Sequence, residues 1–288
     1  MTELYLHTVR EEAQQRLKNI IADLADAEAL VAGSAFVYAT GSFGRLEAGQ
    51  LSDLDLFVVV ETDAENDEEK RLLNNVDEIK LKYQIINVAE KNGLPKFDGG
   101  GKFLASHTVI SYTKWLGSSE DDYRNTLTGR MLLLLESQVL IGEDIYEKTI
   151  INVISKYFRD FEGHEANFLP SFLFNDILRM WRTFCVNYEF YRRDGDSRNK
   201  IKNLKLKFSR MLTCYSAIVY LLAIYAKSNT VRPDDVRKMV ALTPTRRLER
   251  LADGSFWGKG EDISIIQANV FRALGHKLIK WVFKSAGI

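Results

Sequence analysis

The chain has 288 residues, and its 39 Lys and Arg balance its 39 Asp and Glu to a formal net charge of zero. Its length fits one or two domains, and its 46% apolar and 27% charged residues are ordinary for a globular protein, which excludes disordered and fibrous classes. Zero net charge counts against broad binding to nucleic acid or anionic membranes, although it leaves room for a local basic patch.

The compartment is predicted from what the sequence lacks. We see no apolar run long enough to cross a bilayer, and the first residues lack the basic region and apolar stretch of a secretory signal. Cys185 and Cys214 stand in apolar, helix-like surroundings, which favours buried free thiols over a disulfide or a metal site. We therefore expect a cytoplasmic protein with no membrane partner.

Helical and strand-like patterns alternate in the first half of the chain. Apolar residues at near-helical spacing predict an amphipathic helix over Glu11–Leu30. Two β-leaning apolar runs follow, Ala35–Thr40 and Leu54–Val60, with the glycine-punctuated turn Gly41–Arg45 between them. The later segments are predicted, in chain order, as helix or helix plus strand over Leu72–Glu90, loop over Asn92–Gly101, and helix over Arg130–Leu140 and Tyr146–Phe158.

The pattern changes after Gly163 and Pro170, because no convincing strand pattern follows. Four helices are predicted there: Phe172–Arg192, Leu204–Ala226, Pro233–Ala241 and Ile263–Lys284. We therefore expect an α/β domain over residues 1–160 and an all-α domain over residues 161–288.

Two acidic residues open the second strand-like run. Residues two apart in a strand point to the same face, so Asp53 and Asp55 project together while Leu54 and Leu56 turn toward the core. Two hard oxygen ligands on one edge suit Mg²⁺, or Mn²⁺ in its place, which binds carboxylates together with substrate phosphates. A bare Asp-x-Asp also occurs as a turn residue followed by a salt-bridge partner, so the pair becomes specific only with its neighbours.

The preceding turn supplies those neighbours. A strand ending in Gly41-Ser42 lets the backbone approach a ligand closely and turns N–H groups toward phosphate oxygens, and Arg45 offers a fork of donors to a phosphate. The alternatives are an ordinary turn and a solvated surface arginine. A Gly-Ser turn closing one strand, with Asp53 eleven positions after Ser42 opening the next, is a fairly specific combination.

These residues resemble the signature of the nucleotidyltransferases of the DNA polymerase beta type, Gly-Ser followed by Asp-x-Asp. Within that superfamily, Gly44–Glu47 with Ser52–Leu56 looks most similar to bacterial enzymes that nucleotidylylate proteins, the uridylyltransferase of the PII signalling protein and the adenylyltransferase of glutamine synthetase. A weaker likeness to the uridylyltransferase runs with gaps through residues 35–145. It is carried by Phe97–Lys102 with Ser106–Val109, and by Leu133–Glu136 with Leu140–Glu143.

The resemblance implies an α+β fold, a small mixed sheet with helices followed by a helical domain that helps to hold substrate. It also implies a third catalytic carboxylate from a later strand. By the match above this is Asp98, although its three following glycines hardly fit a strand. Glu136 is the alternative, but its helical surroundings favour a packing or orienting role. His107 is either a substrate contact or a buried or capping histidine.

The helical half carries two polar clusters. Asn175, Arg179 and Arg182 are spaced by four and three, so they share one helix face, and a basic run follows between Arg198 and Arg210. Arg179 and Arg182 are candidates to bind the triphosphate or the acceptor, whereas a solvated face with internal ion pairs is the structural alternative.

We therefore predict an ATP- or other NTP-dependent enzyme that transfers a nucleoside monophosphate to an acceptor hydroxyl and releases pyrophosphate, with the nucleotide between the two domains. A protein acceptor is the first choice through the resemblance alone. A small molecule or an RNA end is the alternative acceptor, with nucleic acid not favoured by the net charge. A catalytically weak NTP sensor, or part of a toxin–antitoxin or defence module, is the alternative class. No His-Asp-rich second domain is visible, so we expect a protein other than a full-length PII uridylyltransferase.

Overall fold

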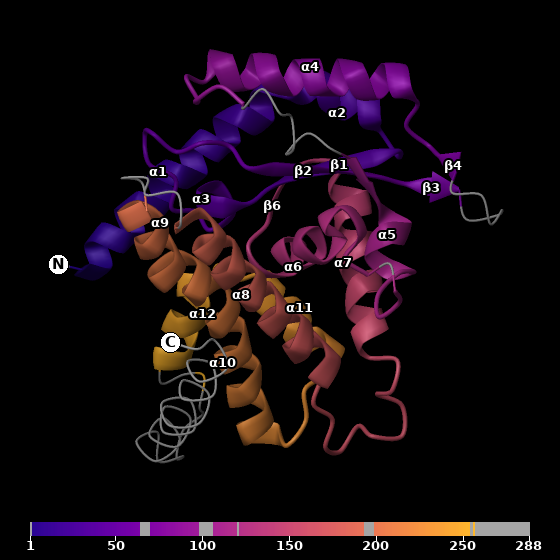
Figure 1. Cartoon of the computed structure of the whole chain (residues 1–288), viewed down its shortest axis with the longest axis vertical. Helices are drawn as coiled ribbons and strands as arrows, with labels where there is room; N and C mark the ends of the chain where they lie inside the picture. Colours follow the sequence, from indigo (N-terminus) through magenta and orange to yellow (C-terminus); the bar gives the residue numbers. More distant parts are fainter. Residues whose placement is uncertain are drawn as a thin grey trace. The chain divides into compact units, whose positions relative to one another are not determined.

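The computed structural model describes residues 2–63, 70–97, 106–119, 121–192, 199–253 and 256. The chain forms two compact units, Met1–Lys156 and Tyr157–Ile288, whose elements are drawn in Figure 1. Asp98 and the predicted helix Ile263–Lys284 lie outside the described residues.

The first unit alternates helices and strands. Its main elements are α1 (Thr2–Asp23), α2 (Ala25–Val31), β1 (Ala35–Ala39), α3 (Gly41–Gly44), β2 (Leu56–Val60), β3 (Thr62–Asp63), β4 (Lys70–Arg71), α4 (Asn75–Lys91), β5 (Ser106–Thr108), α5 (Val109–Thr113), α6 (Thr126–Leu135), β6 (Gln138–Ile141) and α7 (Glu143–Tyr157).

A four-stranded mixed sheet organises this unit, with strand order β5-β2-β1-β6. Strand β1 is antiparallel to both β2 and β6, whereas β2 and β5 are parallel. Ala39 pairs with Leu56, so the end of β1 and the start of β2 meet at one edge of the sheet. The segments that leave and enter the sheet there are the Gly-Ser turn and the Asp-x-Asp segment.

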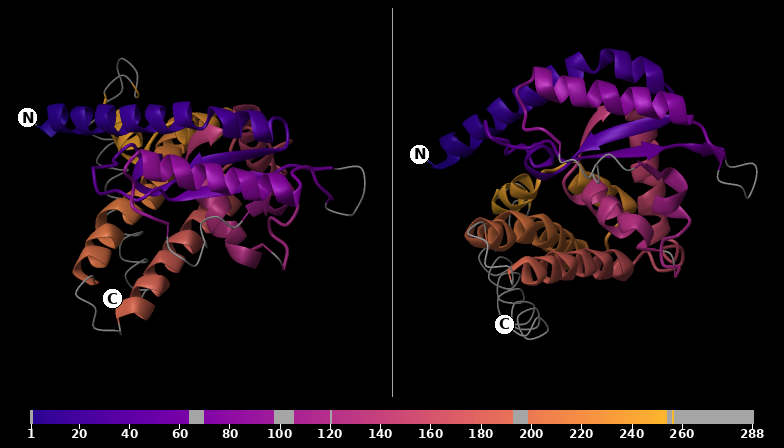
Figure 2. Two further views of the ribbon diagram at one scale, coloured as in Figure 1. Left: turned by 90° about the horizontal axis from the view of Figure 1, so that it is seen from above. Right: turned by 45° about the horizontal axis from the view of Figure 1, so that its top comes forward.

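Helices α1, α2 and α4 cover one face of the sheet, and Figure 2 shows α1 and α4 running across it. The strands contribute every second residue to this core, because side chains alternate between the faces of a strand. These residues are Ala35, Val37 and Ala39 of β1, with Leu56, Val58 and Val60 of β2.

The opposite face is aromatic. Tyr38 of β1 stacks on Phe57 of β2 at 5.4 Å between ring centroids, and His107 of β5 lies 5.5 Å from Phe57 and 5.5 Å from Tyr112 of α5. The Tyr38 hydroxyl donates to the Gly129 carbonyl at 2.8 Å and lies 3.0 Å from the Tyr112 hydroxyl. Buried hydroxyls need such partners, and these fix α5 and α6 against the sheet.

The described part of the second unit is helical. It comprises α8 (Ser171–Arg192), α9 (Asn199–Lys205), a π-helical turn (Leu206–Arg210), α10 (Met211–Ser228), α11 (Pro233–Val240) and α12 (Pro244–Ala252). The buried face of α10 includes Cys214, Ala217 and Leu221, and both cysteines are free thiols.

One described helical stretch, Asn199–Ser228, is long and apolar enough to cross a membrane by length and composition. We did not predict such a stretch from the sequence. A single helix of this kind is weak evidence, because the core helix of a globular domain passes the same test. Its α10 part packs on α8, α11 and α12, which is the packing of a core helix.

Several predicted boundaries need correction. The helix predicted over Arg130–Leu140 ends at Leu135, and Gln138–Ile141 is strand β6, because pairing with β1 overrides the local helical pattern. The helix predicted over Glu11–Leu30 is divided between α1 and α2 at Leu24. Helix α4 begins only after Asn74, whose side chain caps it by accepting the Asp77 N–H at 2.9 Å.

Candidate active site

The Gly-Ser turn begins where β1 ends. The Thr40 N–H donates to the Asp55 carbonyl at 2.8 Å, which extends the pairing of β1 and β2 by one position before the chain turns into α3. Gly41 has φ +64°, a left-handed conformation that side chains disfavour, and a β-carbon there would lie 2.8 Å from Asp55 Oδ2. Glycine is therefore required at position 41 both by its backbone and by the approach of the Asp55 carboxylate.

Asp53 and Asp55 lie in the extended segment immediately before β2 and not within the strand itself. Their side chains nevertheless alternate as a strand requires, because Leu54 and Leu56 are buried in the core while Asp53 is exposed and Asp55 half-buried. Both carboxylates thus belong to the face opposite α1, α2 and α4, and Asp55 stands against the Gly-Ser turn.

Arg45 does not have the environment that the sequence predicted. Its side chain is buried: Nε donates to Glu47 Oε2 at 2.9 Å, and Nη1 donates to Glu136 Oε2 at 3.0 Å. Burial alone would lower the pKa of Arg45, but the charges of Glu136 and Glu47 outweigh it and raise that pKa above its usual value. In this structure the guanidinium fork is directed to two protein carboxylates, and the expected phosphate contact of Arg45 stays a prediction.

Glu136 follows the last residue of α6 and reaches the turn from another part of the chain. Its Oε1 accepts the Gly41 N–H at 3.1 Å, so this N–H is directed to a carboxylate and not outward toward a phosphate. A β-carbon at Gly44 would lie 2.0 Å from the Glu136 carbonyl oxygen, so only glycine fits there. Within the described residues, no three His, Cys, Asp or Glu side chains are grouped to hold a metal ion. Glu136 therefore contacts the turn directly, and the choice between Asp98 and Glu136 as third carboxylate stays a prediction.

His107 was predicted either to contact substrate or to be a buried or capping residue, and in the structure it is buried. It lies between Phe57 and Tyr112, and burial, with a smaller contribution from the Arg124 charge, lowers its pKa to about 4. The imidazole is thus neutral at neutral pH and serves packing.

Sequence reasoning missed Arg16 of α1. Its Nη1 donates to the carbonyl oxygen of Gly49, and its guanidinium lies 5.2 Å from the centroid of the Phe43 ring. Arg16 therefore ties α1 to the loop that joins the Gly-Ser turn to Asp53. Sequence spacing gives no signal for this contact, because one basic residue on an amphipathic helix normally faces solvent. The contact of Glu136 with the turn was missed because the predicted helix Arg130–Leu140 covered most of strand β6.

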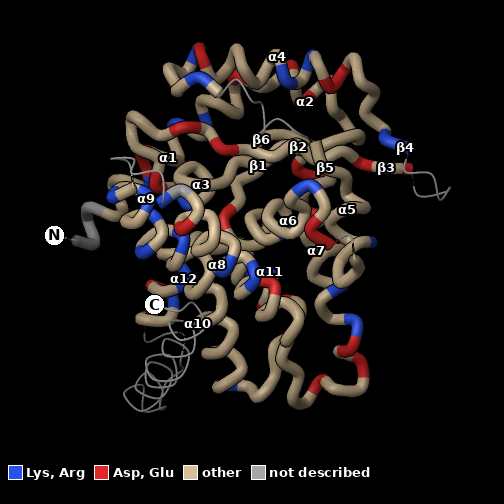
Figure 3. Tube along the Cα trace, in the orientation of Figure 1, with Lys and Arg blue, Asp and Glu red and all other residues tan. Residues whose placement is uncertain are grey.

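In the second unit, Asp176 of α8 organises the predicted arginine face. Asp176 is buried and accepts the Tyr157 hydroxyl at 2.7 Å and Arg179 Nη1 at 2.9 Å. Arg179 therefore forms an ion pair with a protein carboxylate, and its side chain is 39% exposed. Arg182 is exposed. Lysines of α9 add positive charge to the same unit (Figure 3). Phosphate binding by Arg179 or Arg182 stays a prediction.

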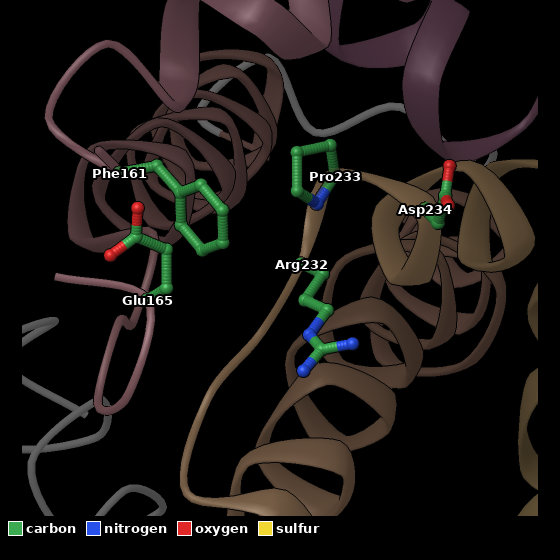
Figure 4. A pocket seen from close by; sticks show the side chains of 5 residues that line it. All are labelled: Phe161, Glu165, Arg232, Pro233 and Asp234. Carbon is green, nitrogen blue, oxygen red and sulfur yellow. The ribbon is translucent and has the colours of Figure 1, made fainter. Parts of the chain in front are cut away.

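A hollow of about 450 Å³ lies in the second unit (Figure 4). Phe161, Glu165, Arg232, Pro233 and Asp234 line it, and none of them was a predicted site residue. Its charged side chains have mixed sign, and the hollow is widely open, so it does not define a ligand.

Comparison with known proteins identifies the first unit. Residues 15–112 match the family described as the nucleotidyltransferase domain, a segment that covers about a third of the chain and includes Gly41, Ser42, Asp53 and Asp55. No curated protein and no solved structure gave a match. The chain thus contains a nucleotidyltransferase domain of the polymerase-beta-like superfamily, which confirms the predicted superfamily and the α+β fold with a small mixed sheet followed by a mostly helical region. The match supports the transfer of a nucleoside monophosphate in general as the class of reaction.

Proposed function

We propose that the protein transfers a nucleoside monophosphate from a magnesium-bound NTP to a hydroxyl group of a protein acceptor. The observation that carries this proposal is the approach of the Asp55 carboxylate to Gly41, with Asp53 on the same face of the same extended segment. This arrangement places two hard oxygen ligands beside a turn that a phosphate chain can approach closely.

The donor set fits a divalent cation such as Mg²⁺ or Mn²⁺, because Asp53 and Asp55 offer carboxylate oxygens and leave the remaining positions to substrate phosphates and water. When bound, the metal would polarise the phosphoryl oxygens and neutralise developing charge. Asp53 and Asp55 would hold the metal, and the Gly41–Ser42 turn would position the triphosphate.

The reaction is an in-line displacement at the α-phosphorus. A bond forms between the acceptor oxygen and the α-phosphorus, the bond from that phosphorus to the bridging oxygen breaks, and pyrophosphate leaves. The acceptor proton passes to solvent or to a base, for which Asp98 stays the candidate. Positioning and electrostatics supply most of the rate in such a mechanism.

The choice of a protein acceptor is supported by the likeness of Gly44–Glu47 and Ser52–Leu56 to the enzymes that modify the PII protein and glutamine synthetase. The zero net charge of the chain counts modestly against an RNA end, since RNA binding needs a basic surface. A small-molecule alcohol is the remaining possible acceptor, and the experiment must distinguish it from a protein acceptor.

A second candidate is NTP binding without turnover. It is favoured by the described residues, among which no three His, Cys, Asp or Glu side chains are grouped to hold a metal ion. Such a protein would bind NTP in a metal-dependent manner and release no pyrophosphate.

The deciding experiment incubates the protein with each of the four α-labelled NTPs, Mg²⁺ and a cell lysate. Label in a protein band together with pyrophosphate supports the proposal, whereas label in RNA or in a small molecule corrects the acceptor. Asp53→Asn with Asp55→Asn should abolish labelling, and Asp26→Asn, an exposed carboxylate of α2, is the matched control. Metal-dependent NTP binding with no labelled product and no pyrophosphate would establish the second candidate.

A further inference from the structure

Glu136 contacts the Gly-Ser turn from a segment outside the matched family region. It stands between α6 and β6 with an extended φ of −157°, and its residue is only 7% exposed. The residue is brought to the turn by β6, since Gln138 of that strand pairs with Ala39 at the end of β1.

Three separate contacts join Glu136 to the four-residue turn and the residue that follows it. One carboxylate oxygen accepts the Gly41 N–H at 3.1 Å, and the other accepts Arg45 Nη1 at 3.0 Å. The backbone carbonyl oxygen of Glu136 packs against Gly44, at a position that a side chain on residue 44 would occupy. Both oxygens are thus engaged at opposite ends of one helical turn.

We propose that Glu136 is a positioning residue for nucleotidyl transfer: its carboxylate fixes the peptide plane of Gly41 and thereby the approach of the turn to Asp55. The proposal rests on the proposed function. Because the Gly41 N–H donates to Glu136, the Gly41–Ser42 turn would position the triphosphate through groups other than this N–H.

Arg45 offsets part of the negative charge that Glu136 brings to the turn. A carboxylate beside the turn would by itself repel phosphate, but Arg45 carries a permanent positive charge and contacts Glu136 directly. Glu47 shares the same guanidinium through Nε, so the three side chains form one hydrogen-bonded group in which Arg45 and Glu136 are buried and Glu47 is half-buried. Removing Glu136 would leave Gly41 without its acceptor and change the charge next to the turn.

The same unit offers a matched control for simple loss of a buried ion pair. Asp121 is buried and pairs with Arg130 Nη2 of α6 at 2.7 Å. This ion pair joins segments other than the Gly41–Arg45 turn, so Asp121→Asn removes a buried carboxylate charge at a different place in the unit.

The test compares Glu136→Ala, Glu136→Gln and Asp121→Asn. Hydrogen exchange of the Gly41 amide is measured by NMR on ¹⁵N-glycine-labelled protein without ligand, and Mg²⁺-dependent NTP binding and transfer are measured separately. In Glu136→Ala, we expect the Gly41 amide to exchange at least tenfold faster and NTP binding or kcat to fall about tenfold. Glu136→Gln keeps the shape but serves only one of its two donors well, so it should lie between wild type and Glu136→Ala. Asp121→Asn should lower Tm and leave both readouts near wild type.

Unchanged Gly41 exchange in both Glu136 variants would overturn the proposal, as would losses of transfer that match those of Asp121→Asn at equal loss of Tm. If Glu136→Ala does not fold, Glu136→Gln decides by the same two readouts. A wild-type protein that binds no Mg²⁺–NTP would refute the proposed function, and with it the role in transfer. The Gly41 exchange data would still show whether Glu136 fixes the turn, so the two failures can be told apart.

Discussion

Replacing Gly41 by alanine tests whether its contact with Asp55 belongs to a functional site. The new β-carbon would lie 2.8 Å from Asp55 Oδ2, whereas carbon–oxygen contacts normally begin at about 3.3 Å. The carboxylate or the turn must therefore move by about 0.5 Å. Since a misplacement of about 1 Å can lower a rate about a hundredfold, we expect transfer to fall at least tenfold.

Gly93 supplies the matched control. It has φ +65°, close to the φ +64° of Gly41, but a β-carbon there would meet no atom within 4 Å. Both alanine variants bear the cost of a left-handed residue, about 1–2 kcal/mol, or a few degrees of Tm. Thermal unfolding gives the Tm loss, and Mg²⁺-dependent NTP binding and pyrophosphate release give function. If both variants lose Tm and activity in the same proportion, the turn is only structural and the reasoning is refuted.

Three further predictions concern metal binding, pH and the helical unit. The double variant Asp53→Asn, Asp55→Asn should lose Mn²⁺ affinity, measured by paramagnetic resonance, while its circular dichroism stays that of wild type; retained affinity would place the metal elsewhere. His107 has a folded pKa of about 4 against about 6.5 unfolded, so the unfolded state binds more protons between these values and stability falls as pH drops from 6.5 to 4, by at most about 1.4 kcal/mol per pH unit. His107→Phe should flatten Tm against pH in that window, and an unchanged curve would contradict the buried neutral imidazole. Arg182→Gln should raise the KM for NTP or acceptor more than Arg179→Gln, because Arg179 is paired with Asp176; equal wild-type values in both variants would leave α8 a scaffold.

The sequence predicted the local backbone around Gly41 and Asp55 because the signals for it are local. The strand Ala35–Ala39, the turn at Gly41 and the alternation around Asp53 and Asp55 depend on neighbours within a few residues. Strand β6 was not predicted, because Gln138–Ile141 follows a helix of leucines and becomes a strand only by pairing with β1. The contact of Glu136 with Gly41 joins residues 95 positions apart, so it follows from that same missed pairing.

The partners of Arg45 could not be predicted from the sequence motif alone. An arginine after a Gly-Ser turn predicts a phosphate contact, and the sequence alone cannot tell a phosphate from a protein carboxylate as its partner. The partner is decided by Glu136, which arrives through tertiary pairing, and by Glu47 two positions on. A buried arginine must have anionic partners, and once two carboxylates supply them, its function is to hold the turn.

The loop between the turn and Asp53 is also held before any ligand binds. The Glu47 N–H donates to the Ser42 carbonyl at 2.8 Å, the Gly49 N–H donates to the Ser52 hydroxyl at 3.0 Å, and Arg16 binds the Gly49 carbonyl from α1. Each bond fixes backbone that would otherwise lose conformational freedom when a nucleotide binds, a loss that costs about 1–2 kcal/mol per residue. The antiparallel pairing of β1 and β2 makes this possible, because it brings the two ends of the loop to one edge of the sheet. Gly41 and Asp55 are therefore placed by the fold of the protein itself, which is the condition for positioning to contribute to the rate of transfer.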